Sequence, residues 1–221
     1  MRFLGLRRRL ALRARAAPEE LAEAWERPLL KATTPVDKLP LLACDAEMSG
    51  LDPRRDELLS LGWVAIDEGE LRLDSTAELR LSSEGGVGQS ATIHHLRDCE
   101  LDGGLALEPA LRRFLHAATG RVLVFHNAAL DMAFLNRAAR RCWGLPLLLP
   151  YVDTLRMEEQ RLRRLDKPLS EGCLRLPECR ARYGLGPHRG HSAFTDALAT
   201  GELLLAQVAA RGSGLLLRDL S

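Results

Sequence analysis

The order of the apolar segments narrows the fold to a mixed sheet covered by helices. Three runs typical of buried or half-buried strands come first, at 39–44, 58–66 and 71–81, and a turn at Asp67-Glu68-Gly69 joins the last two. Farther along, the pattern alternates between helix and strand: a helix at 108–117, a strand at 121–125, a helix that Asn127 caps, a short strand at 151–152 and a long helix at 193–210. A meander followed by such alternation predicts an α/β fold, in which a mixed five-stranded sheet is flanked by helices.

The composition is that of an ordinary globular chain. Of the 221 residues, 46% are hydrophobic and 28% are charged, which is enough apolar material for a sizeable core. No run approaches the ~18 uninterrupted apolar residues that a membrane span requires. The five cysteines are scattered and form no Cys-x-x-Cys pair, as expected of reduced thiols. We therefore expect a cytoplasmic protein that has no membrane partner.

Positive charge gathers at the N-terminus. Residues 1–17 contain six arginines and no acidic residue, so a net charge of +1 leaves the rest of the chain at −5. A mitochondrial transit peptide would fit this composition, but the acidic stretch after Pro18 favours a folded arm. We expect a basic helical arm and linker at 1–38, one domain at 39–211 and a short tail at 212–221.

Four carboxylates end or follow predicted apolar elements. Asp45 and Glu47 close the first strand and point to the same side, because side chains alternate along a strand. Asp131 lies in the first turn of the helix after 121–125, and Asp196 lies early in the last helix, with four residues between it and His191. Taken singly, Asp131 and Asp196 could instead stabilise helix N-termini. Sites in such sheets gather at the carboxyl ends of the strands, so we expect the four acids to converge.

Converging carboxylates repel one another unless cations lie among them. Their hard oxygen atoms favour Mg²⁺ or Mn²⁺ over zinc, and two such ions ~3.5–4 Å apart are the usual device for in-line attack on a phosphodiester. A nearby histidine can serve as the general base. A zinc site could also be assembled from Cys173, Cys179, His188 and His191, although their spacing matches no common zinc module.

The segments around these acids resemble the three motifs of the DEDDh (DnaQ-like) 3′→5′ exonucleases. This family includes the proofreading subunit of the bacterial replicative polymerase. The three segments are Asp45-Ala46-Glu47-Met48-Ser49-Gly50-Leu51-Asp52-Pro53, then Phe125-His126-Asn127-Ala128-Ala129-Leu130-Asp131-Met132-Ala133-Phe134-Leu135, and His191-Ser192-Ala193-Phe194-Thr195-Asp196-Ala197. Two further segments, Ile93-His94-His95-Leu96 and Val152-Asp153-Thr154-Leu155, resemble the family's Ile-His-Gly-Ile and Val-Asp-Thr-Leu. The match covers residues 39–210 in order and spacing.

The resemblance implies an RNase H-like fold and hydrolysis of single-stranded or frayed 3′ ends to 5′-mononucleotides with two Mg²⁺ or Mn²⁺. It makes metal ligands of Asp45, Glu47, Asp131 and Asp196, and a general base of His191. It also implies that the terminal nucleotide is contacted by Met48, Ser49, His94, Leu96 and Asn127.

Departures from the family pattern leave the substrate open. Glu47-Met48-Ser49-Gly50 stands where members often have Glu-Thr-Thr-Gly and is closer to oligoribonucleases; Leu130 stands where phenylalanine is common, and His95 where glycine is common. We expect a nucleic acid with a free 3′ end as partner, DNA before RNA. The alternatives are an exoribonuclease on short RNA and a catalytically silent nucleic-acid-binding module. A silent module would be expected to lack one of the four acids or the histidine, and all five are present in this sequence.

Partners beyond the substrate are expected through the N-terminal arm. About ten residues follow the last helix, so no polymerase-binding C-terminal tail is expected. The arginines of the arm could contact a phosphate backbone or a partner. Alternatively, its leucines pack on the domain while the arginines stay solvated.

Overall fold

The computed structural model describes residues 17–82, 104–188 and 190–220. Its strands are β1 (Leu41–Met48), β2 (Leu58–Asp67), β3 (Glu70–Arg80), β4 (Val122–Phe125) and β5 (Tyr151–Asp153). Its helices are α2 (Glu19–Glu26), α5 (Leu107–Ala118), α6 (Ala128–Trp143), α7 (Thr154–Arg164), α8 (Leu176–Arg182) and α9 (Ala193–Arg211), with 3-10 turns at Val36–Lys38 and Leu217–Leu220.

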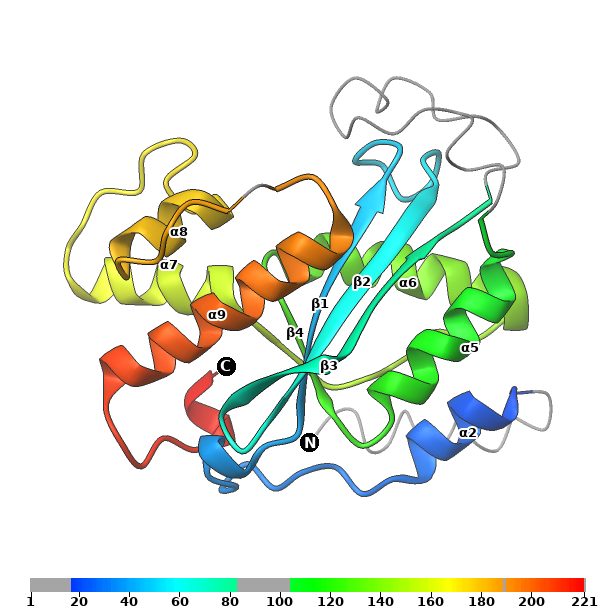
Figure 1. Cartoon of the computed structure of the whole chain (residues 1–221), viewed down its shortest axis with the longest axis horizontal. Helices are drawn as coiled ribbons and strands as arrows, with labels where there is room; N and C mark the ends of the chain where they lie inside the picture. Colours follow the sequence, from blue (N-terminus) through cyan, green and yellow to red (C-terminus); the bar gives the residue numbers. More distant parts are fainter. Residues whose placement is uncertain (1–16, 83–103, 189, 221) are drawn as a thin grey trace.

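The strands form one mixed sheet in the order β3-β2-β1-β4-β5. β1, β2 and β3 pair antiparallel as a meander, and β4 and β5 continue the sheet parallel to β1. Helix α9 crosses one face of this sheet, and α5 and α6 lie on the other (Figure 1). The predicted mixed five-stranded sheet flanked by helices is confirmed.

The central strand β1 is apolar on both faces because helices cover both. Leu42 and Cys44 belong to the core cluster under α5 and α6, whereas Leu41 and Ala43 belong to the cluster under α9. The same alternation carries Asp45 and Glu47 onto the α9 side.

β1 is longer than the predicted run that ends at residue 44. Its antiparallel pairing with β2 continues to Met48, which lies opposite Leu58. Asp45 and Glu47 therefore lie within the strand and do not close it, although they point to the same side as predicted. By contrast β4 pairs with β1 only along Leu41–Ala43, so the later residues of β1 extend beyond β4.

The described part of the N-terminal segment packs on the domain. Leu21 of α2 is fully buried, and the indole Nε1 of Trp25 donates a hydrogen bond to the carbonyl of Leu147 at 2.7 Å. The linker also pairs with the C-terminal residues, since the Val36 N–H donates to the Leu215 carbonyl at 2.9 Å. The division of the chain at 38 and 211 stays a prediction, and the arginines of residues 1–16 lie outside the described residues.

Within the described ranges, no helix has both the length and the apolar character to cross a membrane.

Candidate active site

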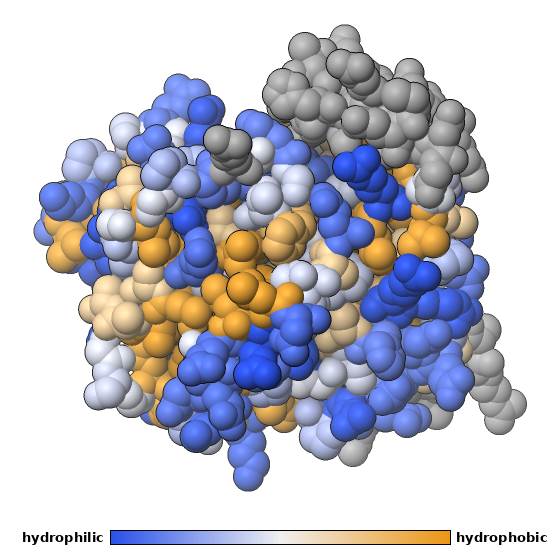
Figure 2. All heavy atoms as spheres, in the orientation of Figure 1, coloured by the Kyte–Doolittle hydropathy of each residue, from blue (hydrophilic) through white to orange (hydrophobic). Residues whose placement is uncertain are grey.

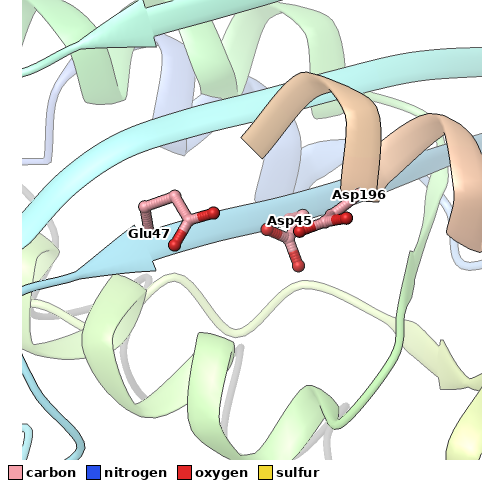
Figure 3. Close-up of side chains that lie close together, drawn as sticks. All are labelled: Asp45, Glu47 and Asp196. Carbon is pink, nitrogen blue, oxygen red and sulfur yellow. The ribbon is translucent and has the colours of Figure 1, made fainter. Parts of the chain in front are cut away.

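Three of the four predicted carboxylates form one cluster. Ligand oxygens of Asp45, Glu47 and Asp196 lie within 4.8 Å of one another, and in the described part of the chain no other set of three potential metal ligands comes together. Figure 3 shows Asp45 and Glu47 on β1, with Asp196 entering from the first turn of α9. The zinc set suggested by the cysteines and histidines is not assembled.

A glycine in β2 allows α9 to come this close to the sheet. Gly62 lies opposite Asp45, and a Cβ at Gly62 would lie 2.1 Å from the carbonyl carbon of Ala193. The backbone at the start of α9 thus rests directly on β2. The Ser192 hydroxyl caps this helix by accepting from the Thr195 N–H at 3.3 Å. Together these contacts place Asp196 beside Asp45, and sequence reasoning missed Gly62.

Asp131 comes from α6, which packs on the sheet face opposite α9. Its side chain is 4% exposed, and its carboxylate interacts with the backbone N–H of Ala46, on the part of β1 that extends beyond β4. It does not belong to the 4.8 Å group, yet its negative charge raises the pKa of Asp45. The four predicted acids therefore surround the end of β1, three as one cluster and one adjacent.

Burial and mutual repulsion favour the protonated forms of these acids. Burial raises the pKa of Asp45 well above its usual range, and the charges of Asp131, Asp196 and Glu47 raise it further. Burial, with the charge of Asp196, raises the pKa of Glu47 to about 7. Burial raises the pKa of Asp131 to about 8. A site built only from carboxylate oxygens that repel one another fits a hard divalent cation.

A fifth carboxylate holds the start of α6. Asp153 accepts from the N–H groups of Asn127 and Ala128, both at 3.1 Å, and from that of Leu155 at 3.0 Å. One side chain thus caps both α6 and α7. Asn127 occupies the predicted N-cap position, but its side chain makes no capping bond because its backbone is left-handed, with φ 86°. The cap proper is Asp153, which thereby fixes Asp131 one turn into α6.

The loop before α9 holds both oxygens of Asp196. The backbone N–H of His191 donates to Oδ2 at 3.2 Å, and Nε2 of His188 lies 2.9 Å from Oδ1. The His188 side chain is 12% exposed, whereas His191 is exposed and has a left-handed backbone, with φ 80°. Sequence reasoning considered His188 only for zinc, because a histidine eight residues before an aspartate gives no signal of contact.

The residues predicted to contact the terminal nucleotide differ in burial and in position. Met48 is buried in the core cluster under α5 and α6. The hydroxyl of Ser49 accepts from the Glu57 N–H at 2.9 Å, which anchors the loop after β1. Asn127 is exposed at the start of α6. His94 and Leu96 lie outside the described residues.

Comparisons with known proteins agree with this geometry. The family model described as "Exonuclease" (RNase T) matches residues 42–204. The PolC-type DNA polymerase III of Thermotoga petrophila is 31% identical over 161 residues, 73% of this chain, which spans only 11% of that protein. The DNA polymerase III subunit epsilon of Treponema pallidum is 29% identical over 168 residues, 76% of this chain and 75% of the subunit.

Among solved structures, E. coli Exonuclease I in complex with a dT13 oligonucleotide superposes with a TM-score of 0.62 at 15% identity. The match covers 76% of this chain and 40% of that one, and it shows the RNase H-like fold. Fold, motif order and family match agree. The chain belongs to the exonuclease family, among its DnaQ-like 3′–5′ members.

Proposed function

We propose that this chain is a divalent-cation-dependent 3′→5′ exonuclease that releases 5′-mononucleotides from single-stranded or frayed DNA. The observation that carries the proposal is the convergence of Asp45, Glu47, Asp131 and Asp196 at the end of β1. The family membership supports it, as does the likeness to an Exonuclease I structure that holds an oligonucleotide. The chain spans only 11% of its PolC-type relative from Thermotoga petrophila, so the match covers no more than the exonuclease part of that protein.

The four carboxylates would hold two Mg²⁺ or Mn²⁺ ions. When bound, such ions supply positive charge to the scissile phosphate and lower the pKa of water. Asp45, Glu47 and Asp196 provide the clustered oxygens, and Asp131 provides the fourth carboxylate beside Ala46. The buried setting strengthens their attraction for cations, since it penalises four uncompensated negative charges.

His191 is proposed as the general base. It takes a proton from the attacking water onto an imidazole nitrogen while the new P–O bond forms. The bond from phosphorus to the 3′ oxygen of the preceding nucleotide breaks, which leaves a shortened strand and a 5′-mononucleotide. The exposed position of His191, on the loop that holds Asp196, gives its ring access to this place. Met48, Ser49, His94, Leu96 and Asn127 are proposed to contact the terminal nucleotide.

Short RNA is the second candidate substrate. The sequence Glu47-Met48-Ser49-Gly50, closer to oligoribonucleases, favours it, whereas the segment around Asp131 favours the proofreading exonucleases. A cytoplasmic location, consistent with the polymerase III relatives, completes the proposal.

The test is digestion of matched single strands, as DNA and as RNA, labelled at either the 3′ or the 5′ end, in the presence of Mn²⁺. We expect immediate mononucleotide release from the 3′ label and a shrinking ladder from the 5′ label, faster on DNA. Faster digestion of RNA would correct the substrate. Cleavage inside the strand, or no cleavage by folded protein, would refute the proposal.

A further inference from the structure

A cavity of about 420 Å³ opens beside the start of α6. The cavity is lined by His126 and Asn127, by residues of the loop between α7 and α8, and by Leu176 at the start of α8. Its surface is mainly apolar, with Leu155, Leu169 and Leu174 among the lining residues. No residue of this cavity has a role in the cation cluster.

We propose that this cavity binds the base of the nucleotide that precedes the scissile bond, while Arg175 contacts that nucleotide's phosphate. The inference rests on the proposed exonuclease function and adds a second nucleotide subsite to it. The occupant is a unit of the substrate strand, because His126 of the lining lies close enough to the cluster to interact with the charge of Asp196, and because Arg175 offers a cation to a phosphate.

The position of the cavity follows from the geometry of α6. Asn127 immediately precedes α6 and Asp131 lies in the first turn of that helix, so the two are about one helical turn apart, ~5.4 Å along the helix axis. Asp131 contacts β1 beside the cluster, so the mouth of the cavity begins one turn from the reacting centre. Consecutive nucleotides of an extended strand are separated by a similar distance.

The cavity is held open by hydrogen bonds of its own wall. Nδ1 of His126 lies 2.8 Å from the Thr154 hydroxyl, and Nε2 of the same ring lies 2.8 Å from the carbonyl of Leu174. The Arg182 guanidinium also donates to the carbonyl of Cys173. These bonds tie the loop to the end of β4 and to α8, so the subsite exists before a strand enters it.

Two polar side chains at the cavity, those of Asn127 and Arg175, have no polar partner among the described residues. Among the described residues, neither the Asn127 amide nor the Arg175 guanidinium makes an ion pair or a hydrogen bond. The Nε atom of Arg175 lies 3.4 Å from where a Cβ of Gly172 would be, so the side chain lies along the cavity wall. Asn127 also holds a left-handed backbone, a cost that recurs at ligand-binding positions.

These groups suit a nucleotide of any sequence. The volume is within the ~300–1,000 Å³ range of small-molecule sites. Leucine side chains can contact the face of any base, and sequence-independent binding of single strands depends on such face contacts together with cations along the backbone. The arginine also offsets the negative potential that the nearby carboxylates impose on an approaching strand.

The test compares three substrates with Mn²⁺: the p-nitrophenyl ester of thymidine 5′-monophosphate, the trinucleotide dTpTpT, and the same trinucleotide with an abasic middle unit. Only the trinucleotides place a unit in the cavity. The variants are Leu169→Asp, Arg175→Ala and Arg175→Lys. The control is Arg163→Ala, since the Arg163 guanidinium pairs with Glu159 and does not line the cavity.

We expect loss of the middle base to lower kcat/KM of the wild type about tenfold. Leu169→Asp should be insensitive to that loss, because its cavity no longer accepts the base. Arg175→Ala should raise KM for dTpTpT about tenfold relative to the ester, with partial recovery in Arg175→Lys. Leu169 is at the surface, so its replacement should keep the melting temperature, which is measured for every variant.

If the abasic trinucleotide is hydrolysed as fast as dTpTpT, and the variants keep the wild-type ratio of trinucleotide to ester turnover, the cavity is not a nucleotide subsite. The proposed function would survive that result. If the wild type hydrolyses neither the ester nor the trinucleotides, the proposed function itself fails, and the subsite with it.

Discussion

Asp196 meets two histidines, and their contacts assign them different tasks. The His188 side chain is nearly buried and its ring lies against one carboxylate oxygen, whereas His191 is exposed and donates its backbone N–H to the other oxygen. A ring in contact with a metal-binding carboxylate orients that ligand. The exposed ring of His191 is the one we propose to take the proton of the attacking water. These contacts suit His188 to a positioning role and leave the proposed role of general base to His191.

Replacing each histidine with alanine should therefore change different quantities. His191→Ala should lower kcat about 100-fold or more and leave Mn²⁺ affinity nearly unchanged. His188→Ala should weaken Mn²⁺ affinity about tenfold, because Asp196 loses its partner. The maximal rate and the Mn²⁺ affinity of each variant are both obtained by titrating turnover with Mn²⁺. A full rate in His191→Ala would remove its role as base, and equal effects of the two variants would contradict the separation.

The pairing of β1 with β2 and the packing of α9 on both strands support the site. The close contact at Gly62 lets the start of α9 touch the sheet. Farther along α9, Gly201 makes a second close contact, since a Cβ there would lie 3.2 Å from the Cβ of Ala43. Small residues along this contact set how deep the helix lies, and hence where Asp196 lies.

Gly62→Ala should displace the start of α9, because the new methyl group would overlap the backbone of Ala193. We expect a loss of about 1–3 kcal/mol in unfolding free energy and a large loss of turnover. Gly186→Ala is the matched control, since a Cβ there meets no atom within 4 Å. Urea denaturation and turnover measure the two effects. Wild-type turnover in Gly62→Ala would mean that the depth of α9 does not position Asp196.

The shared cap at Asp153 predicts a second effect at this scale. Asp153→Ala removes the acceptor for the start of α6 and of α7 at once. We expect about 2 kcal/mol less unfolding free energy, twice the usual cost of one cap, together with slower turnover because Asp131 is less well fixed. The exposed Asp74 on β3 gives the control variant Asp74→Ala. Equal unfolding free energies for the two variants would refute the double cap.

Local patterns predict the elements here, and long-range contacts decide the site. Alternation placed Asp45 and Glu47 on one side of a strand, and periodicity located the helices that carry Asp131 and Asp196. The role of Gly62 depends on α9, more than a hundred positions later, and that of Asp153 on the start of α6. Such contacts leave no periodic trace in the sequence, so Gly62, the cap at Asp153 and the contact of His188 could not be predicted.

At the scale of the whole molecule, the crowded acids link stability to pH. The pKa of Glu47 rises from 4.5 to about 7 on folding, and that of Asp131 from 3.8 to about 8. A raised pKa means that the folded protein binds these protons more tightly than the unfolded chain does. The associated stability is complete below about pH 4 and is lost as the pH rises toward 8.

Without divalent cations, the melting temperature should therefore fall between pH 5 and pH 8. Mn²⁺ should reverse the fall, since cations replace the protons. Melting curves with EDTA and with Mn²⁺ at both pH values measure this, and Glu47→Gln should flatten the EDTA series. A metal-free protein that is more stable at pH 8 than at pH 5 would contradict the electrostatic account.

The most direct test of the central claim measures cation binding and hydrolysis in the same titration. Wild type, Asp45→Asn and the surface control Asp74→Asn are titrated with Mn²⁺ while the hydrolysis of 3′-labelled single-stranded DNA is followed. The account predicts no turnover in EDTA, turnover that rises as Mn²⁺ binds in wild type and Asp74→Asn, and a loss of about 1,000-fold or more in Asp45→Asn. Full turnover in EDTA, or a wild-type rate in Asp45→Asn, would contradict it.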